Sequence, residues 1–278
     1  MTQKTKKLGI IAGGGEIPQL LIQNCIENKR DFFVLAIENN ADKAIFTPDI
    51  PHQWIRIGQA GTGFKRMAEE NVEEIVLIGT IHRPSVADLM PDLRTAAFFA
   101  KIGMKSLGDD GILRALIKEI ESENMRVIGI HEVMPDLLAK EGILTKQKPD
   151  KQALADIDRG TEVAYQLGKL DVGQSVIVQQ GLVLGLEGIE GTDELIKRCG
   201  TYQRKGAGGV LVKLRKPQQD MRIDLPTVGL KTIENLHQSG MRGLALHAGN
   251  TLIINEKEVI ALANKYGLFI KGITPKGE

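Results

Sequence analysis

The chain has 278 residues, of which 36 are basic, 35 are acidic and 4% are aromatic. Charges that nearly cancel provide no general field for nucleic acid, so we do not expect nucleic-acid binding. The length and the 42% hydrophobic content favour two domains with separate cores. Cys25 and Cys199 lack a CxxC partner and clustered histidines, which favours buried, reduced thiols in a reducing compartment.

The N-terminal segment and the later apolar runs are shorter than targeting and membrane-spanning segments. Lysines precede the apolar run 8–12, but this run is too short for the core of a secretory signal. No later stretch approaches the roughly 20 apolar residues that cross a bilayer. We therefore expect a cytoplasmic protein whose contact with a membrane is peripheral at most.

Apolar runs alternate with helical periodicity through the first half of the chain. We predict strands at 8–12, 32–38, 54–58, 74–79 and 126–133, and helices at 16–29, 63–72, 84–102 and 110–125. This alternation is typical of βαβ units on a parallel sheet. It predicts a Rossmann-like domain over residues 1–135, followed by a less periodic linker at 136–149.

The second half predicts a mixed α/β domain over residues 150–278. A helix at 150–167 precedes the run 175–187, which reads as a hairpin that turns at Gln180 and Gly181. We predict further helices at 190–199 and 230–240, a strand at 208–214, a second hairpin at 243–254, and a final helix and strand that end at residue 273.

Gly13, Gly14 and Gly15 lie between the first strand and the first helix, where backbone amides and a helix N-terminus favour a phosphate. Pro18 occupies the place of the third glycine of the dinucleotide fingerprint, so the motif is incomplete. Glu38 ends the second strand at about the spacing of a ribose-binding acid. An NAD site is therefore one alternative for this domain. A tight chain reversal without ligand is the other alternative.

Two further groups in the first domain are candidates for substrate binding. Gly79, Thr80 and Arg83 follow the fourth predicted strand, at the edge where open α/β sheets bind ligands. Arg83 suits a phosphate, although a surface arginine beside a proline is an equal alternative. Asp109 and Asp110 precede a helix, where one aspartate suffices as a cap and the second is available to a ligand.

The densest polar stretch of the chain connects a strand to a helix in the second domain. It contains Lys213, Lys216, Gln219, Asp220, Arg222 and Asp224. Cleavage of a phosphoanhydride needs positive charge on the oxygens and carboxylates for Mg²⁺ or water, and this stretch supplies both. In an extended conformation Asp220, Arg222 and Asp224 project to one face. A solvated charged loop is the alternative.

The segment EGIEGTD offers Glu187, Glu190, Thr192 and Asp193 before a helix. Thr192 or Asp193 as helix cap and a site for phosphate and Mg²⁺ are equal alternatives here. The histidines lack the spacing of a zinc site, and no nucleophile elbow is present. Any hydrolysis would therefore use water directly.

Eight blocks of the sequence span nearly the whole chain and are GIIAGGGEIP, GTIHRPS, GDDGILRALI, HEVMPDLL, LDVGQSVIVQQG, EGTDELIKR, GGVLVKLRKPQQDMRIDLPTVG and GLFIKGI. In this order they resemble the LpxI-type UDP-2,3-diacylglucosamine pyrophosphatases of lipid A biosynthesis. The resemblance implies a Rossmann-like N-terminal domain, a C-terminal α/β domain and a ligand cleft between them. It also implies Mg²⁺-dependent attack of water, without a covalent intermediate, that releases UMP and 2,3-diacylglucosamine 1-phosphate.

The resemblance also assigns roles to residues. Asp224 of the DLP motif is implied as the essential catalytic residue, with Asp220 and Lys213 beside it. We predict Asp224, Asp220 and Asp193 as the metal ligands. We predict that the substrate is bound by Gly13, Gly14, Gly79, Thr80, Arg83, Asp109, Asp110, Gln174, Thr192 and Arg222. The substrate would be a lipid-linked nucleotide sugar reached from the cytoplasmic face of the inner membrane, and the oligomeric state stays open.

Two other functions remain compatible with parts of the sequence. An NAD(P) oxidoreductase is suggested by the first domain alone, and a nucleotide-sensing module would need no chemistry. The second domain discriminates between them and a hydrolase, because neither alternative requires the cluster of Lys, Arg and Asp between Lys213 and Asp224.

Overall fold

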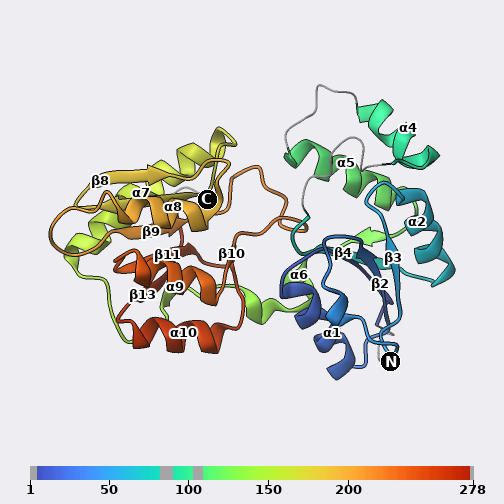
Figure 1. Cartoon of the computed structure of the whole chain (residues 1–278), viewed down its shortest axis with the longest axis horizontal. Helices are drawn as coiled ribbons and strands as arrows, with labels where there is room; N and C mark the ends of the chain where they lie inside the picture. Colours follow the sequence, from blue (N-terminus) through green and yellow to red (C-terminus); the bar gives the residue numbers. More distant parts are fainter. Residues whose placement is uncertain (1–4, 82–89, 103–108, 276–278) are drawn as a thin grey trace. The chain divides into compact units, whose positions relative to one another are not determined.

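The computed structural model describes residues 5–81, 90–102 and 109–275. The chain divides into two compact units, Met1–Pro135 and Asp136–Glu278, which we call the first and the second unit (Figure 1). Both cysteines are buried and free, as the sequence predicts. Among the described residues, no helix has the length and apolar character needed to cross a membrane.

The first unit contains a parallel sheet. Its strands are β1 (Leu8–Ala12), β2 (Phe32–Ile37), β3 (His52–Ile55), β4 (Glu74–Ile78) and β5 (Arg126–Val127). They lie in the order β3-β2-β1-β4-β5, and every neighbouring pair is parallel. The chain winds outward from β1 to β3 and then returns to place β4 on the other side of β1. The predicted Rossmann-like sheet is confirmed, and its switch point lies between β1 and β4.

The helices of the first unit differ from prediction mainly at their ends. They are α1 (Ile17–Glu27), α2 (Ala60–Glu69), α4 (Leu93–Ile102), α5 (Asp109–Glu121) and α6 (Ile130–Val133), with short 3₁₀ turns η1 (Lys43–Ile45) and η3 (Pro135–Leu137). The helix predicted at 84–102 is seen from Leu93, and residues 82–89 lie outside the description.

The predicted strand at 126–133 is shorter than expected. It ends at Val127, and α6 begins soon afterwards at Ile130. The Glu132 carboxylate accepts the backbone N–H of Gly129 at 2.9 Å. This contact satisfies an amide at the start of the helix, so helix formation competes with extension of the strand.

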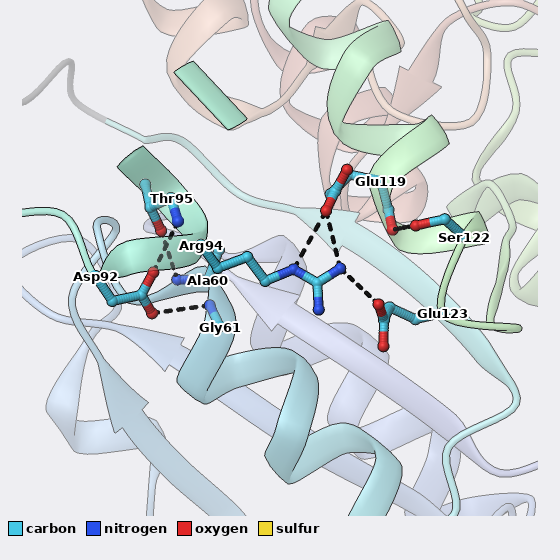
Figure 2. Close-up of polar contacts among 8 residues, drawn as sticks. All are labelled: Ala60, Gly61, Asp92, Arg94, Thr95, Glu119, Ser122 and Glu123. Carbon is cyan, nitrogen blue, oxygen red and sulfur yellow. Dashed lines mark hydrogen bonds and ion pairs between the residues drawn. The ribbon is translucent and has the colours of Figure 1, made fainter. Parts of the chain in front are cut away.

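Asp92 joins the starts of two helices in the first unit. Its carboxylate accepts the backbone N–H of Gly61 at 2.9 Å at the start of α2, and that of Thr95 at 2.8 Å in the first turn of α4 (Figure 2). The neighbouring Arg94 extends from α4 to Glu119 at 2.8 Å and to Glu123 at 2.5 Å. Helices α2, α4 and α5 are therefore held together by side-chain contacts as well as packing.

The second unit contains a mixed sheet. Its strands are β6 (Gly142–Ile143), β7 (Ser175–Gln179), β8 (Leu182–Leu186), β9 (Val210–Lys213), β11 (Gly243–His247) and β13 (Phe269–Ile273), in the order β6-β13-β11-β9-β7-β8. Strands β9, β11 and β13 are parallel, whereas β7, β8 and β6 each pair antiparallel. The mixed α/β fold is confirmed. A separate parallel pair joins β10 (Thr227–Val228) to β12 (Leu252–Ile253).

One predicted hairpin is present and the other is wrong. Strands β7 and β8 turn at Gln180 and Gly181, whose φ angles of 53° and 80° fit a tight two-residue turn. The run 243–254 does not form a hairpin, because β11 pairs with β9 and β13 while β12 pairs with β10. Every residue of β11 is buried, as is typical of a central parallel strand.

Helices cover both faces of the sheet in the second unit. They are α7 (Lys151–Lys169), α8 (Gly191–Gly200), α9 (Leu230–Gln238) and α10 (Glu256–Lys265). One face packs against α7 through buried residues that include Val176, Val178, Val210 and Val212. The other packs against α8, α9 and α10 through Ile177, Leu211, Leu244 and Ile270 (Figure 1). Adjacent strand residues thus serve opposite cores.

Residues 136–149, which the sequence suggests as a linker, pack within the second unit. Ala139 is buried and its N–H donates to the Thr251 carbonyl at 2.8 Å. Strand β6 pairs with β13 at the edge of the sheet. The Asp150 side chain then caps α7 by accepting the N–H of Ala153 at 2.8 Å.

Candidate functional site

In the first unit, the glycines after β1 meet the chain after β4 through backbone contacts. The N–H of Gly14 donates to the Thr80 carbonyl at 2.8 Å, and the N–H of Thr80 returns to the Gly14 carbonyl at 2.9 Å. A Cβ atom on Gly13 would lie 2.6 Å from the Thr80 oxygen, and one on Gly79 would lie 2.6 Å from the Gly14 oxygen. These glycines therefore allow two chain segments to approach closely at the switch point.

The open part of this turn begins one residue later. The N–H of Gly13 donates to the Ile78 carbonyl at 2.8 Å, so the amides of Gly13 and Gly14 are both used inside the protein. A Cβ atom on Gly15 would meet nothing within 4 Å. If a phosphate binds here, the space open to it lies beside Gly15.

A hollow of about 500 Å³ lies next to the end of β2. It is lined by Glu38, Asn39, Lys43, Phe46 and Trp54, and the rings of Phe46 and Trp54 meet edge to face at 5.0 Å. Glu38, the acid noted for its spacing, thus stands at the wall of this hollow.

Three predicted residues of the first unit lie wholly or partly outside the described residues. Arg83 lies outside the described residues. Asp109 and Asp110 form the first positions of α5, and their side chains are likewise outside the description. Their roles remain predictions.

In the second unit, Lys213 is the centre of a buried polar cluster. It is the last residue of β9 and is 6% exposed, and its Nζ donates to Thr192 Oγ1 at 2.7 Å. Thr192 lies in the first turn of α8 and donates to Glu187 Oε1 at 2.7 Å. The other oxygen of Glu187 accepts the N–H of Gln174 at 3.1 Å. Residues from three parts of the chain, at 174, 187–192 and 213, therefore meet at the carboxyl end of β9.

The charges around Lys213 oppose the effect of its burial. Burial lowers the pKa of the Lys213 ammonium, and the negative charges of Glu187, Asp193 and Asp224 act in the opposite direction. The structure thus brings the predicted residues Asp193 and Asp224 within electrostatic reach of Lys213.

Gln174 has an acceptor that no described residue satisfies. Its side-chain oxygen is buried and has no hydrogen-bond partner in the described part of the chain. Because buried polar atoms are normally paired, an unpaired oxygen beside the cluster suits a ligand that donates to it. This supports the predicted role of Gln174 in substrate binding.

The loop that follows β9 is folded into turns, so the prediction of an extended stretch with one-sided Asp220, Arg222 and Asp224 is wrong. The N–H of Asp224 donates to the Asp220 carbonyl at 3.2 Å, and the Asp220 carboxylate accepts the N–H of Arg222 at 3.0 Å. Aspartate favours such local turns over extended chain. The Arg222 guanidinium then pairs with the Asp220 carboxylate at 2.7 Å.

Asp224 has a different environment from Asp220. The side-chain amide of Gln219 donates to the Asp224 carboxylate, and Gln219 is only 3% exposed. Gln219 is itself anchored, because its side-chain oxygen accepts the N–H of Lys216 at 3.2 Å. The Asp224 carboxylate is therefore oriented by a buried neighbour rather than by a direct ion pair.

The start of α8 is not capped by either predicted side chain. The helix begins at Gly191, and its N-cap residue, Glu190, makes no side-chain cap hydrogen bond. Thr192 instead joins the Lys213 cluster, and Asp193 pairs with Lys231 at 2.9 Å. The capping interpretation is wrong, which removes the simplest structural explanation of Thr192.

The three predicted metal ligands differ in how well they fit Mg²⁺. Within residues 5–81, 90–102 and 109–275, no group of three or more His, Cys, Asp or Glu side chains is placed to hold a metal ion. Asp220 is paired with Arg222, and Asp193 with Lys231. Mg²⁺ is commonly held by one or two carboxylates together with substrate phosphates and water. Of the three, Asp224 fits such a site.

Sequence reasoning did not select Glu187 or Ser175 as site residues. Ser175 begins β7, and its hydroxyl lies 3.3 Å from Thr192 Oγ1. Glu187 was visible as one of four polar residues before α8, but its burial depends on the pairing of β7 with β8. No local signal distinguishes it from the exposed acids nearby.

Both units match parts of one protein family. Residues 7–137 match the LpxI N-terminal domain, and residues 140–271 match the LpxI C-terminal domain. The chain belongs to the LpxI family. It is 36% identical over 278 residues to a protein of Caulobacter vibrioides named UDP-2,3-diacylglucosamine pyrophosphatase LpxI, covering 98% of this chain and 99% of that protein. The LpxI C-terminal domain contains the whole cluster from Gln174 to Asp224.

Proposed function

We propose that this LpxI-family chain hydrolyses the pyrophosphate bond of UDP-2,3-diacylglucosamine to UMP and 2,3-diacylglucosamine 1-phosphate. The name of the Caulobacter vibrioides relative supports this substrate. The observation that carries the proposal is the buried Lys213 ammonium, held by Thr192 within reach of the charge of Asp224. Such a pair supplies both charges that the cleavage of a phosphoanhydride needs.

Lys213 is proposed to bind the phosphoryl oxygens on which negative charge develops. An ammonium that is already oriented and shielded from water stabilises this charge without reorganisation. Asp224, fixed by Gln219, is proposed to orient the attacking water or a metal-bound group. Water oxygen would bond to the phosphorus on the sugar side while the bond to UMP breaks, and the proton of the water would pass to solvent or to a carboxylate.

Mg²⁺ is part of the proposal as the cofactor. When bound, it would add positive charge to the pyrophosphate and lower the pKa of a bound water. Asp224 together with the phosphates of the substrate is the site that suits it best, while Asp220 and Asp193 would first have to leave Arg222 and Lys231. We propose cytoplasmic action on the lipid-linked substrate, with at most peripheral contact at the inner membrane.

The direct test is incubation with UDP-2,3-diacylglucosamine and Mg²⁺. We expect UMP to appear, EDTA to abolish its release, and Mg²⁺ or Mn²⁺ to restore it. In water enriched in ¹⁸O, the label should enter 2,3-diacylglucosamine 1-phosphate and not UMP. Full activity in EDTA would remove the metal from the proposal, and the absence of UMP under all conditions would overturn it.

A second test addresses the alternative of an NAD(P) oxidoreductase. A fluorescence titration with NADH should show no binding, because the first unit lacks the third glycine of the dinucleotide fingerprint at Pro18. Saturable NADH binding would favour that alternative.

A further inference from the structure

Glu187 follows β8 and lies at the far end of the hydrogen-bonded series that begins at Lys213. We propose that Glu187 is a positioning residue, which holds the Lys213 ammonium toward a phosphoryl group through the Thr192 hydroxyl. The inference rests on the proposed function, and it adds a residue that acts on Lys213 without contacting the substrate.

The direction of each hydrogen bond in this series is fixed by the chemistry of its groups. A lysine ammonium only donates, so Thr192 Oγ1 accepts from Lys213 at 2.7 Å. The single hydroxyl hydrogen of Thr192 therefore goes to Glu187 Oε1, which also lies at 2.7 Å. Ser175 Oγ, at 3.3 Å, can then only donate to Thr192. The Thr192 hydroxyl has one orientation as long as Glu187 accepts from it.

Glu187 is itself held in place on several sides. It is 6% exposed, its second carboxylate oxygen accepts the N–H of Gln174 at 3.1 Å, and its own N–H donates to the Ser175 carbonyl at 2.9 Å. A Cβ atom on Gly173 would lie 2.2 Å from the Glu187 carbonyl oxygen. The Glu187 carboxylate is therefore held in place, and through Thr192 it restrains the Lys213 ammonium.

The series leaves part of the Lys213 ammonium available. Among the described residues, Lys213 Nζ donates to Thr192, and the nearby Asp193 pairs with Lys231 instead. An ammonium carries three N–H groups, so two remain for a ligand. Placing a hydroxyl between the charges keeps the ammonium oriented and available to an anion.

A double-mutant cycle on the full chain tests the coupling between Glu187 and Lys213. With UDP-2,3-diacylglucosamine as substrate, we expect Glu187→Gln to lower kcat about tenfold or more, with a smaller change in KM. In a Lys213→Met background the same substitution should change kcat less than about twofold, because its target is gone. Equal factors in both backgrounds would overturn the proposal.

Asp156→Asn is the matched control. Asp156 is 1% exposed in the same unit, and its carboxylate accepts the N–H of Gly181 at 2.7 Å at the end of β7 opposite Ser175. This variant should lower the melting temperature, leave kcat of the folded enzyme nearly unchanged, and add independently to Lys213→Met. Glu187→Gln behaving like Asp156→Asn would show a purely structural role.

Thr192 provides a second check within the series. Thr192→Ser keeps the hydroxyl and should retain most of the turnover, whereas Thr192→Val should match Glu187→Gln in kcat and in its dependence on Lys213. Equal losses in the Ser and Val variants would contradict the role of the hydroxyl.

Binding of inorganic pyrophosphate, measured by calorimetry, separates this proposal from the proposed function. We expect the parent to bind pyrophosphate, and Glu187→Gln and Lys213→Met to weaken this binding by similar factors. If the parent releases no UMP but this pattern holds, the proposed function fails and Glu187 keeps its role. If the parent neither releases UMP nor binds pyrophosphate, or Glu187→Gln binds it as the parent does, the role of Glu187 is overturned.

Discussion

The carboxyl edges of the two sheets differ in the kind of residue that forms them. In the first unit, Gly14 and Thr80 meet there by backbone hydrogen bonds, and a side chain on Gly13 or Gly79 would collide with backbone. In the second unit, the same edge places a buried lysine among carboxylates. Glycines, which have no side chain, define the first edge, whereas charged side chains define the second.

This difference separates two ways in which an α/β sheet can serve a ligand. A glycine edge offers close approach and backbone amides, which suit recognition without much chemistry. A buried edge with opposite charges stabilises a change in charge, which suits a reaction. We therefore expect turnover to depend mainly on the second unit, and the variants below test this expectation from the largest effect to the smallest.

Asp224→Ala should cause the largest loss of turnover. A fixed carboxylate that acts mainly in the transition state contributes on the order of 3 kcal/mol to the barrier, which corresponds to roughly a hundredfold in kcat. KM and the melting temperature should change little. Asp158→Ala, at an exposed position of α7, is the control. An Asp224→Ala enzyme within a few-fold of the parent would end the assignment of the second unit as the reactive one.

Gly79→Ala should cause the largest loss of stability at the first edge. The φ angle of Gly79 is 88°, and a Cβ atom there would lie 2.6 Å from the Gly14 oxygen. Strain of this kind costs about 3 kcal/mol in the free energy of unfolding. Gly15→Ala has a similar φ of 92° but open space, so it should cost only about 1 kcal/mol. Denaturant unfolding of both variants checks this difference.

Asp92→Asn should cost about 1 to 2 kcal/mol, because it weakens the caps of α2 and α4 (Figure 2). Burial raises the pKa of Asp92, but hydrogen bonds from Thr95, Thr62 and Gly61 outweigh it and lower the pKa overall. A lowered pKa stabilises the fold above the unfolded value of about 3.9, and this stability is lost as the pH falls through the folded pKa.

The pH dependence of that cost sharpens the test of Asp92. The difference in unfolding free energy between the parent and Asp92→Asn should be constant from neutral pH to about pH 5, and should shrink below about pH 4. Turnover at neutral pH should be unchanged. A cost that stays constant down to pH 3 would show that the charge of Asp92 contributes nothing to the caps.

Asp193→Ala should have the smallest effect. Its partner Lys231 is 73% exposed, and exposed ion pairs contribute about 0 to 1 kcal/mol. Turnover should stay within a few-fold of the parent, in contrast to Asp224→Ala. A hundredfold loss of turnover that excess Mg²⁺ partly restores would instead support the metal-binding role predicted from the sequence.

The sequence predicted elements that have strong local signals. The parallel sheet of the first unit follows from alternating apolar runs and helices, and the β7–β8 hairpin follows from Gln180 and Gly181 between two apolar runs. The run 243–254 contains the same type of signal, with Gly249 and Asn250 at its centre, yet it does not pair with itself. Strand β11 instead pairs on its two sides with β9 and β13, and no local sequence pattern reveals this pairing.

The candidate site was predictable in part. Charge and the family motifs selected Lys213, Asp193 and Asp224, and the position before a helix selected Thr192. The structure places Thr192, Asp193 and Asp224 around Lys213. The geometry of Asp220 and Arg222 was not predictable from alternation, because a local turn replaced the extended chain. Glu187 was missed because its burial arises from tertiary packing against Gly173 and Ser175.

The position of β13 in the second sheet has a consequence for the order of folding during synthesis. This last strand lies between β6, the first strand of the unit, and β11, and Gly272 packs closely against the Lys140 carbonyl. The second unit therefore cannot close its sheet until residues 269–273 have left the ribosome. The first unit completes its sheet once β5 at Arg126–Val127 has emerged. We expect nascent chains that end before residue 269 to carry a folded first unit and an aggregation-prone second one.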